Sequence, residues 1–141
     1  MKVIYNDGHV AECPDDEELH VIRHTAAHIL AQAVKRLYPE AHCAYGPATE
    51  KGFYYDVDLG DKKLSDEDLP AIEAEMAKIV KENLPIKPFV LSREDAVKLM
   101  EERGETYKVE HIGDLPEDAV LSFYQQGEYI DMCVGPHLTY T

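Results

Sequence analysis

Two pairs of side chains that can bind a metal ion or transfer a proton stand far apart in the chain. The run "HTAAH" places His24 and His28 four residues apart, and "CVGPH" places Cys133 and His137 four residues apart. Residues at this spacing on a helix share one face, so the two histidines would project together. The Gly-Pro within the second pair predicts a sharp bend. If the pairs converge, three imidazoles and a thiol form either a tetrahedral metal site or a cluster of acid–base groups around a substrate.

Each of these residues also has an ordinary structural interpretation. HxxxH is a short motif that often marks two surface histidines, and a cysteine such as Cys133 is commonly a small buried core residue. Asp131 lies two residues before Cys133, so on a strand both side chains point to the same face. There Asp131 would orient a histidine, accept a hydrogen bond from an amine, or carry a solvent-side charge. We interpret the remaining cysteines and histidines as structural or exposed: Cys13, Cys43, His9, His20, His42 and His111.

Three segments have the pattern of helices. In residues 14–39, Asp15 and Glu18 resemble a capping box, and one apolar stripe at helical spacing consists of Ile22, Ala26, Ile29, Leu30, Ala33 and Leu37. Residues 64–85 predict a second helix that starts near Ser65 and Asp68 and buries Leu69, Ile72, Met76 and Ile79. Residues 92–104 predict a short helix, with Ser92 as its cap and Gly104 at its end.

The other segments have the pattern of strands. We expect a hairpin in the first twelve residues around Asn6-Asp7-Gly8, two strands in 42–58 around a turn at Lys51-Gly52, and an edge strand in the proline-containing 85–92. Residues 106–112 ("TYKVEHI") alternate in a way that predicts a strand, on which Lys108 would face solvent. Residues 119–125 and 128–134 predict a hairpin that turns at Gly127. Helices alternating with hairpins predict a two-layer α+β domain, with helices on one face of a mostly antiparallel sheet.

The composition restricts the class of protein. The chain has 141 residues, 45% of them hydrophobic and 30% charged, which is typical of one soluble globular domain. Three cysteines without a signal peptide argue against a disulfide framework, and no apolar run is long enough to span a membrane, so a cytoplasmic location is expected. The net charge of −14 is opposite in sign to that of a protein that binds nucleic acid by itself. Either the partner is not nucleic acid, or another domain supplies the basic surface that binds it.

Four separated runs together resemble a known family. "HTAAH", "GFYYDVD", "GETYKVE" and "YIDMCVGPH" occur in the order found in the N-terminal editing domain of bacterial threonyl-tRNA synthetases. The related alanyl-type editing proteins share HxxxH and CxxxH. They usually carry a Cys-Gly-Gly-Thr-His type of run where this chain has Cys133-Val134-Gly135-Pro136-His137, so the threonyl type fits better.

The resemblance implies a domain organisation. It covers the chain from about Asp15 onward, so we expect a short N-terminal β extension at 1–14 and the editing domain at 15–141. The ubiquitin-like domain that usually precedes it, and the aminoacylation and anticodon-binding domains that follow, are expected to be absent. An excised editing module is therefore expected, with a freestanding editing protein as the alternative.

The resemblance also implies a reaction, hydrolysis in cis of the ester of serine wrongly attached to threonine tRNA. The partners would be the acceptor end of that tRNA and the aminoacylation domain of the same enzyme, with no membrane involved. Position by position, the family's site matches His24, His28, Lys108, Asp131, Cys133 and His137. Asp131 would bind the serine ammonium or hydroxyl, Lys108 and one histidine would activate water, and Tyr54 and Tyr55 would contribute to the pocket wall.

The cofactor remains open between two readings. The threonyl type is expected to work through water and side chains without a required metal, and ATP would be used only by the absent synthetase core. The alternative is zinc on His24, His28, Cys133 and His137, as in the alanyl-type relatives. The competing functions are accordingly a freestanding zinc-dependent aminoacyl-tRNA deacylase and a non-catalytic metal-binding domain.

Overall fold

The fold alternates helices with short antiparallel strands. The computed structural model describes the backbone of residues 1–141 and all side chains except that of Tyr45. In chain order the elements are β1 (Lys2–Ile4), β2 (Val10–Glu12), α1 (Glu18–Leu37), β3 (His42–Tyr45), β4 (Asp56–Asp58), α2 (Leu69–Glu82), β5 (Ile86–Ser92), α3 (Arg93–Glu102), α4 (Thr106–Gly113), β6 (Val120–Gln126), β7 (Tyr129–Met132) and β8 (His137–Leu138). The described strands form three antiparallel sheets, ordered β2-β1-β8, β3-β4 and β5-β6-β7. The α+β prediction is confirmed.

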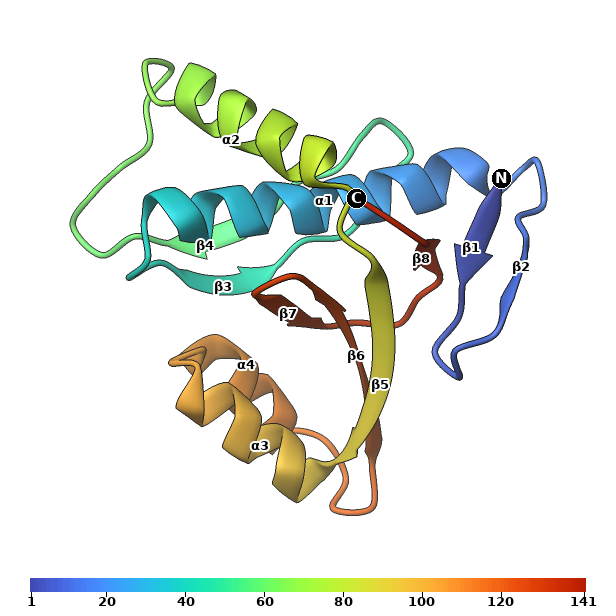
Figure 1. Cartoon of the computed structure of the whole chain (residues 1–141). Helices are drawn as coiled ribbons and strands as arrows, with labels where there is room; N and C mark the ends of the chain where they lie inside the picture. The colour runs from blue at the N-terminus through green and yellow to red at the C-terminus, as the bar shows by residue number, and fades with distance from the viewer.

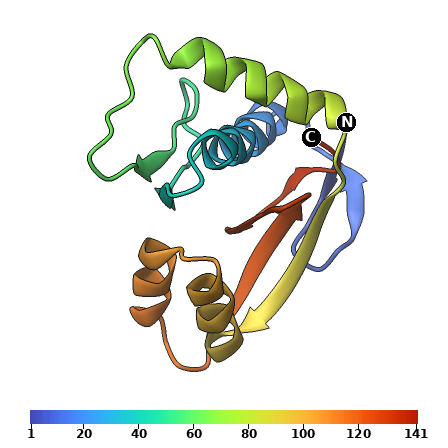
Figure 2. The same ribbon diagram turned by 60° about the vertical axis from the view of Figure 1, so that its left-hand side comes forward.

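Four apolar clusters hold the described elements together, and the two larger ones lie under the helices. Helix α2 packs along α1, while α3 and α4 lie on one side of the β5-β6-β7 sheet and the β1-β2 hairpin lies on the other (Figures 1 and 2). The core between α1 and α2 consists of Ile29, Ala33, Val34, Ala41, Ile72 and Ile79. The core under α3 and α4 consists of Ala96, Met100, Ile112, Leu121 and Phe123. Burial of these side chains supplies most of the drive for folding.

The predicted apolar stripe of α1 is only partly buried. Ile29 and Ala33 are in the core, whereas Ile22 is 43% exposed. The N-terminal turns of α1 extend past the end of α2, which leaves this part of α1 uncovered by that helix (Figure 1). Leu69, at the first turn of α2, is likewise 54% exposed. Periodicity identified the two helices correctly but set the ends of their buried faces wrongly.

The helix boundaries show one error and one success. The capping box at Asp15 and Glu18 is wrong: Asp15 lies in a turn, and α1 starts at Glu18, after Glu17 at the cap position. The cap of α3 is confirmed, because Ser92 Oγ accepts a hydrogen bond from the Asp95 backbone N–H at 3.3 Å. The predicted edge strand and the turn at Gly127 are also as expected.

The prediction of a strand at 106–112 is wrong, because these residues form helix α4. Their alternation and β-branched content favour a strand locally. Lys108 and Ile112, however, are four residues apart and both buried, and Ile112 packs with Ala96 and Met100 of α3. Tertiary burial of this helical face outweighs a local preference worth at most about 1 kcal/mol.

The N-terminal hairpin is part of the sheet that holds the C-terminal histidine. Strand β1 pairs with β8, and Ile4 lies opposite His137. The proposed boundary between 14 and 15 stays a prediction, but residues 1–14 help to position the second motif. Within the described chain, the helices lack the length and apolar composition needed to cross a lipid bilayer.

A buried amide pair joins α1 to the end of β6. Gln126 Nε2 donates to Gln32 Oε1 at 2.8 Å, and both side chains are fully buried. Replacement of Gln126 by Ala would leave the buried Gln32 side-chain carbonyl without its hydrogen-bond donor, so we expect the free energy of unfolding to fall by about 1–3 kcal/mol. Urea denaturation measures this change. Gln125→Ala is the matched control, because its amide bonds only to a nearby turn carbonyl, and an equal loss in both variants would contradict the prediction.

Candidate functional site

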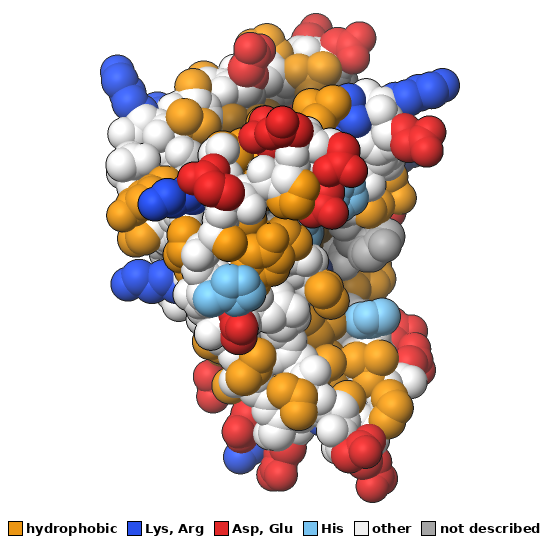
Figure 3. All heavy atoms as spheres, turned by 90° about the vertical axis from the view of Figure 1, so that its right-hand side faces the viewer, with side chains coloured by type: hydrophobic (Ala, Val, Ile, Leu, Met, Phe, Trp, Pro, Cys, Tyr) orange, Lys and Arg blue, Asp and Glu red, His pale blue; other side chains and the backbone are white. Residues whose placement is uncertain are grey.

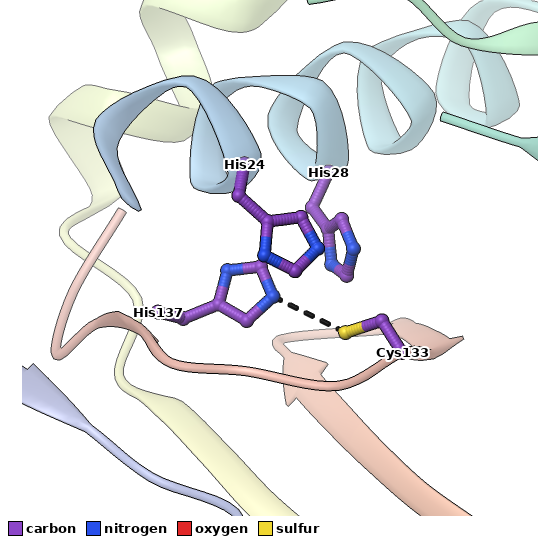
Figure 4. Close-up of side chains that lie close together, drawn as sticks. All are labelled: His24, His28, Cys133 and His137. Atoms are coloured by element: carbon purple, nitrogen blue, oxygen red, sulfur yellow. Dashed lines mark hydrogen bonds between the residues drawn. The ribbon is translucent and has the colours of Figure 1, made fainter. Parts of the chain in front are cut away.

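The two predicted pairs converge. His24 and His28 project from α1 toward Cys133, which follows β7, and His137, at the start of β8 (Figure 4). One donor atom from each of the four residues lies within 4.8 Å of the others. The rings of His24 and His137 are 4.0 Å apart between centroids, and Cys133 Sγ lies 3.2 Å from His137 Nε2.

The bend between Cys133 and His137 is built around Gly135. A Cβ at this position would lie 1.9 Å from the hydroxyl oxygen of Tyr124, so a side chain cannot fit. Asn6 Oδ1 accepts hydrogen bonds from the Gly135 N–H at 2.9 Å and from the Tyr124 hydroxyl at 2.7 Å. The turn after β1 thus supports the loop that carries the second motif, and the bond from Gly135 to Pro136 is cis.

A cavity of about 840 Å³ opens beside the cluster. Its walls come from α1, β3, α4, β6 and β7 and from the loops after β3 and β7. Side chains with polar chemistry in the lining are His20, His24, His28, Tyr55, Tyr107, Lys108, His111, Ser122, Asp131 and Cys133. His137 is fully buried behind them and does not contribute to this lining. His20 and His111, which were interpreted as structural or exposed, are exposed and line the cavity.

A buried ion pair forms one wall of the cavity. Lys108 Nζ lies 2.6 Å from Asp131 Oδ1 and donates to the Tyr55 hydroxyl at 2.9 Å. Asp131 also accepts from the hydroxyls of Tyr55 at 2.5 Å and Tyr129 at 2.8 Å, and from the Met132 N–H at 2.8 Å. Both carboxylate oxygens of Asp131 therefore already accept hydrogen bonds from groups of the protein. Lys108 has three N–H bonds and two described partners, which leaves one N–H for a ligand.

Helix α4 is fixed at the residue that precedes its first turn. Glu105 is buried, accepts a hydrogen bond from the Cys43 backbone N–H at 3.0 Å, and forms an ion pair at 2.9 Å with Lys35 of α1. These contacts tie α4 to β3 and α1. They place Lys108, one turn later, opposite Asp131.

The charges in this wall stabilise each other. Burial raises the pKa of the Asp131 carboxyl, but the Lys108 ammonium and His28 outweigh burial and hold the pKa well below its usual range. Burial likewise lowers the pKa of Lys108, and the opposing attraction of Asp131 leaves it raised overall. The pair is therefore ionised at neutral pH.

The histidines and the cysteine of the cluster are neutral at neutral pH. Burial lowers the pKa of His24, lowers that of His28 to about 4, and lowers that of His137 well below its usual value. Burial and the Asp131 charge raise the pKa of the Cys133 thiol well above its usual value. The imidazoles can thus accept a proton, and the sulfur is present as a thiol.

Three residues of the site were missed or misplaced from the sequence. Tyr54 is 46% exposed and lies outside the described cavity lining, whereas its neighbour Tyr55 lines the cavity and bonds to Asp131. Tyr129 and Thr25 are buried polar residues in contact with the site. The adjacent tyrosines gave no signal for which one faces inward, and a single threonine within "HTAAH" gave no signal that its hydroxyl would be buried against His137.

The four-residue cluster fits a zinc ion by donor type. Structural and catalytic zinc sites use histidine nitrogen and cysteine sulfur, and neighbouring ligand atoms lie about 3.3–3.7 Å apart. The 3.2 Å separation of Cys133 Sγ and His137 Nε2 is close to this spacing, and the 4.8 Å limit for the set requires small side-chain movements.

Comparison with known proteins identifies the relatives of the chain. No protein-family model matches it. The threonine–tRNA ligase of Clostridioides difficile is 61% identical over 127 residues, which are 90% of this chain and 20% of that protein. The threonine–tRNA ligase of Carboxydothermus hydrogenoformans is 58% identical over the same shares, and that of Clostridium novyi is 54% identical over 100% of this chain and 22% of that protein. The chain is therefore homologous to a segment that makes up about one fifth of threonine–tRNA ligases.

Proposed function

We propose that the chain is an editing module that hydrolyses the ester of seryl-tRNA(Thr), with residues 15–141 as the editing domain. The main observation behind this proposal is that His24 of α1, Lys108 of α4 and Cys133 after β7 line one cavity of about 840 Å³. Cavities that bind small ligands usually measure roughly 300–1,000 Å³, so an aminoacyl-adenosine end can enter. The homology to threonine–tRNA ligases supplies the substrate class.

The discrimination between threonine and serine requires a second site on physical grounds. A synthetic pocket that hydrogen-bonds the threonine hydroxyl strongly rejects amino acids without a hydroxyl. Serine retains the hydroxyl and lacks only a methyl group, which is worth about 1–3 kcal/mol. A separate cavity that admits serine and excludes the extra methyl group of threonine removes the remaining errors.

The residues support a hydrolysis without a covalent intermediate. His24, partly exposed and neutral, accepts a proton from a water molecule that attacks the ester carbonyl carbon. The free N–H of Lys108 and the Cys133 thiol, which both line the cavity, donate to the carbonyl oxygen as negative charge develops on it. The bond to the ribose oxygen then breaks, and that oxygen takes the proton that His24 received from the water. Asp131 acts through Lys108, because its own oxygens are already supplied with donors.

The distribution of charge supports an anionic substrate end. Among the described lining residues, Asp131 is the one carboxylate, and Lys108 neutralises it. On the face shown in Figure 3, acidic side chains lie chiefly over the upper and lower parts, and hydrophobic and histidine side chains are frequent across the middle. The acceptor end of the tRNA thus meets a carboxylate-poor cavity. The aminoacylation domain of the same enzyme would supply ATP chemistry and the wider tRNA grip.

A zinc-dependent deacylase is the second candidate, favoured by the proximity of the four donor atoms. His24, His28, Cys133 and His137 would hold the ion, which would supply a Lewis acid near the ester. Lys108 and Asp131 would keep the same positions and the same charges in either case.

A deacylation assay on seryl-tRNA(Thr) and threonyl-tRNA(Thr) tests the proposal. We expect hydrolysis of the seryl ester well above its spontaneous rate, little hydrolysis of the threonyl ester, and a large loss in Cys133→Ala. Cys13→Ala, a buried cysteine remote from the cavity, is the matched control. Metal content is measured on the same sample, and stoichiometric zinc with loss of activity on chelation favours the second candidate. A seryl ester that is no more labile than in buffer, even at high protein concentration, refutes editing by this chain.

A further inference from the structure

The search for groups that the proposed reaction does not use leads to Thr25, a buried residue of α1 between the two histidines of the first motif. Its side chain is 1% exposed. Thr25 Oγ1 lies 2.9 Å from His137 Nδ1 and accepts a hydrogen bond from the Leu138 backbone N–H at 3.1 Å. This hydroxyl therefore joins α1 to β8 at the residue that carries the buried imidazole.

We propose that Thr25 is a positioning residue that fixes the tautomer of His137 and, through it, the orientation of the Cys133 thiol at the cavity wall. One lone pair of the hydroxyl is used by the Leu138 N–H. Among the described residues, His137 Nδ1 is the acceptor within reach of the hydroxyl hydrogen. A buried O–H without an acceptor is costly, so Thr25 donates and His137 Nδ1 accepts.

The proton of His137 then lies on Nε2. This nitrogen is 3.2 Å from Cys133 Sγ, a contact that the dashed line in Figure 4 marks, so in this tautomer its N–H is directed at the sulfur. His137 itself is fully buried and has both ring nitrogens engaged, so it is a link between Thr25 and Cys133 and does not contact water in the cavity. The relay runs from the Thr25 hydroxyl through the imidazole to the thiol.

The relay also specifies what a metal ion would change. A metal ion on Nε2 would need the lone pair there, so the proton would lie on Nδ1 and the Thr25 hydroxyl would accept from it. The hydroxyl would then accept from both Nδ1 and the Leu138 N–H, and its own hydrogen would lose its described acceptor. Serine keeps the hydroxyl, whereas valine keeps the shape and loses it.

Nitrogen NMR of the His137 ring, assigned by comparison with His137→Gln, tests the tautomer without any substrate. In the metal-free wild-type protein we expect a protonated Nε2 and an unprotonated, hydrogen-bonded Nδ1. In Thr25→Val the Nδ1 resonance should move toward that of a nitrogen without a hydrogen bond, and in Thr25→Ser it should return. Thr106→Val, an exposed threonine on α4, is the control that should leave the ring unchanged.

Of the measurements that test this proposal, only the deacylation rate rests on the proposed editing function. In Thr25→Val the single-turnover deacylation rate should fall roughly 10- to 100-fold, as for other supporting partners of site residues, and Thr25→Ser should restore it. The rate at which iodoacetamide alkylates Cys133 should change in Thr25→Val and recover in Thr25→Ser. Rescue by serine shows that these readouts depend on the hydroxyl, and the ring nitrogen resonances separate its bond to His137 from its structural bond to the Leu138 N–H.

Three results would overturn the proposal: protonation on Nδ1 in the metal-free wild type, an unchanged ring spectrum in a folded Thr25→Val, or failure of serine to rescue. If Thr25→Val does not fold, the wild-type spectrum and Thr25→Ser still decide it. If the wild type lacks deacylation while the ring spectra behave as expected, the editing function fails and the relay stands.

Discussion

Replacement of Asp131 by Asn is expected to lower the free energy of unfolding by about 3–5 kcal/mol and to reduce deacylation of seryl-tRNA(Thr) about 10²–10³-fold. The Lys108 ammonium is 8% exposed and its charge partner is Asp131 at 2.6 Å. In Asp131→Asn the buried ammonium keeps only neutral acceptors among the described side chains, the Tyr55 hydroxyl and the introduced amide oxygen. The ammonium would either lose its proton or move, and both changes remove the group that stabilises the developing oxyanion.

Urea denaturation and single-turnover deacylation measure the two effects of Asp131→Asn. Asp7→Asn is the matched control, because Asp7 is exposed in the β1-β2 turn and should change stability by less than about 0.5 kcal/mol. The double variant Lys108→Met with Asp131→Asn separates the effects: it has no buried ammonium and keeps an amide oxygen that accepts from the Tyr55 and Tyr129 hydroxyls, so it should recover much of the stability while activity stays lost. A folded Asp131→Asn protein with wild-type stability would show that the pair is not a buried charge pair in solution.

Replacement of His24 by Ala is expected to slow deacylation about 10²–10⁴-fold with little effect on stability. His24 is the partly exposed histidine of the cluster and faces the cavity, whereas His28 is 2% exposed and lies 3.6 Å from Asp131. A water molecule can therefore reach His24 most directly. Because burial lowers the pKa of His24, its ring is neutral and able to accept a proton at neutral pH.

The comparison for His24→Ala is His9→Ala, a histidine in the β1-β2 turn that stacks on Tyr5 outside the cavity. Both proteins are assayed at saturating protein concentration, so that weak binding does not imitate slow chemistry. A rate within twofold of wild type in His24→Ala would assign proton transfer to another group, and His28→Ala would then be tested next.

The local features of this site follow from the residues near them in the chain. The spacing of His24 and His28 placed them on one helical face, because 3.6 residues per turn bring positions four apart together. Ser92 and Gly127 marked a helix start and a hairpin turn through side-chain chemistry and φ = +59° respectively. These features depend on interactions between near neighbours, which a sequence pattern records directly.

The convergence of these features in space depends on contacts between distant parts of the chain. The convergence of His24 and His28 with Cys133 and His137 depends on β1 pairing with β8 and on α1 lying against it, contacts between residues more than 100 positions apart. Lys108 lies on a helix that faces Asp131, although the apolar and polar residues of its segment alternate as in a strand. The helix forms because it buries Ile112 against α3. Asp131 is the counter-ion of Lys108, and the hydroxyls of Tyr55 and Tyr129 stabilise it by donating hydrogen bonds to its carboxylate. Long-range packing sets these choices, because the free energy of burying a whole face exceeds the small local preferences that a sequence pattern expresses.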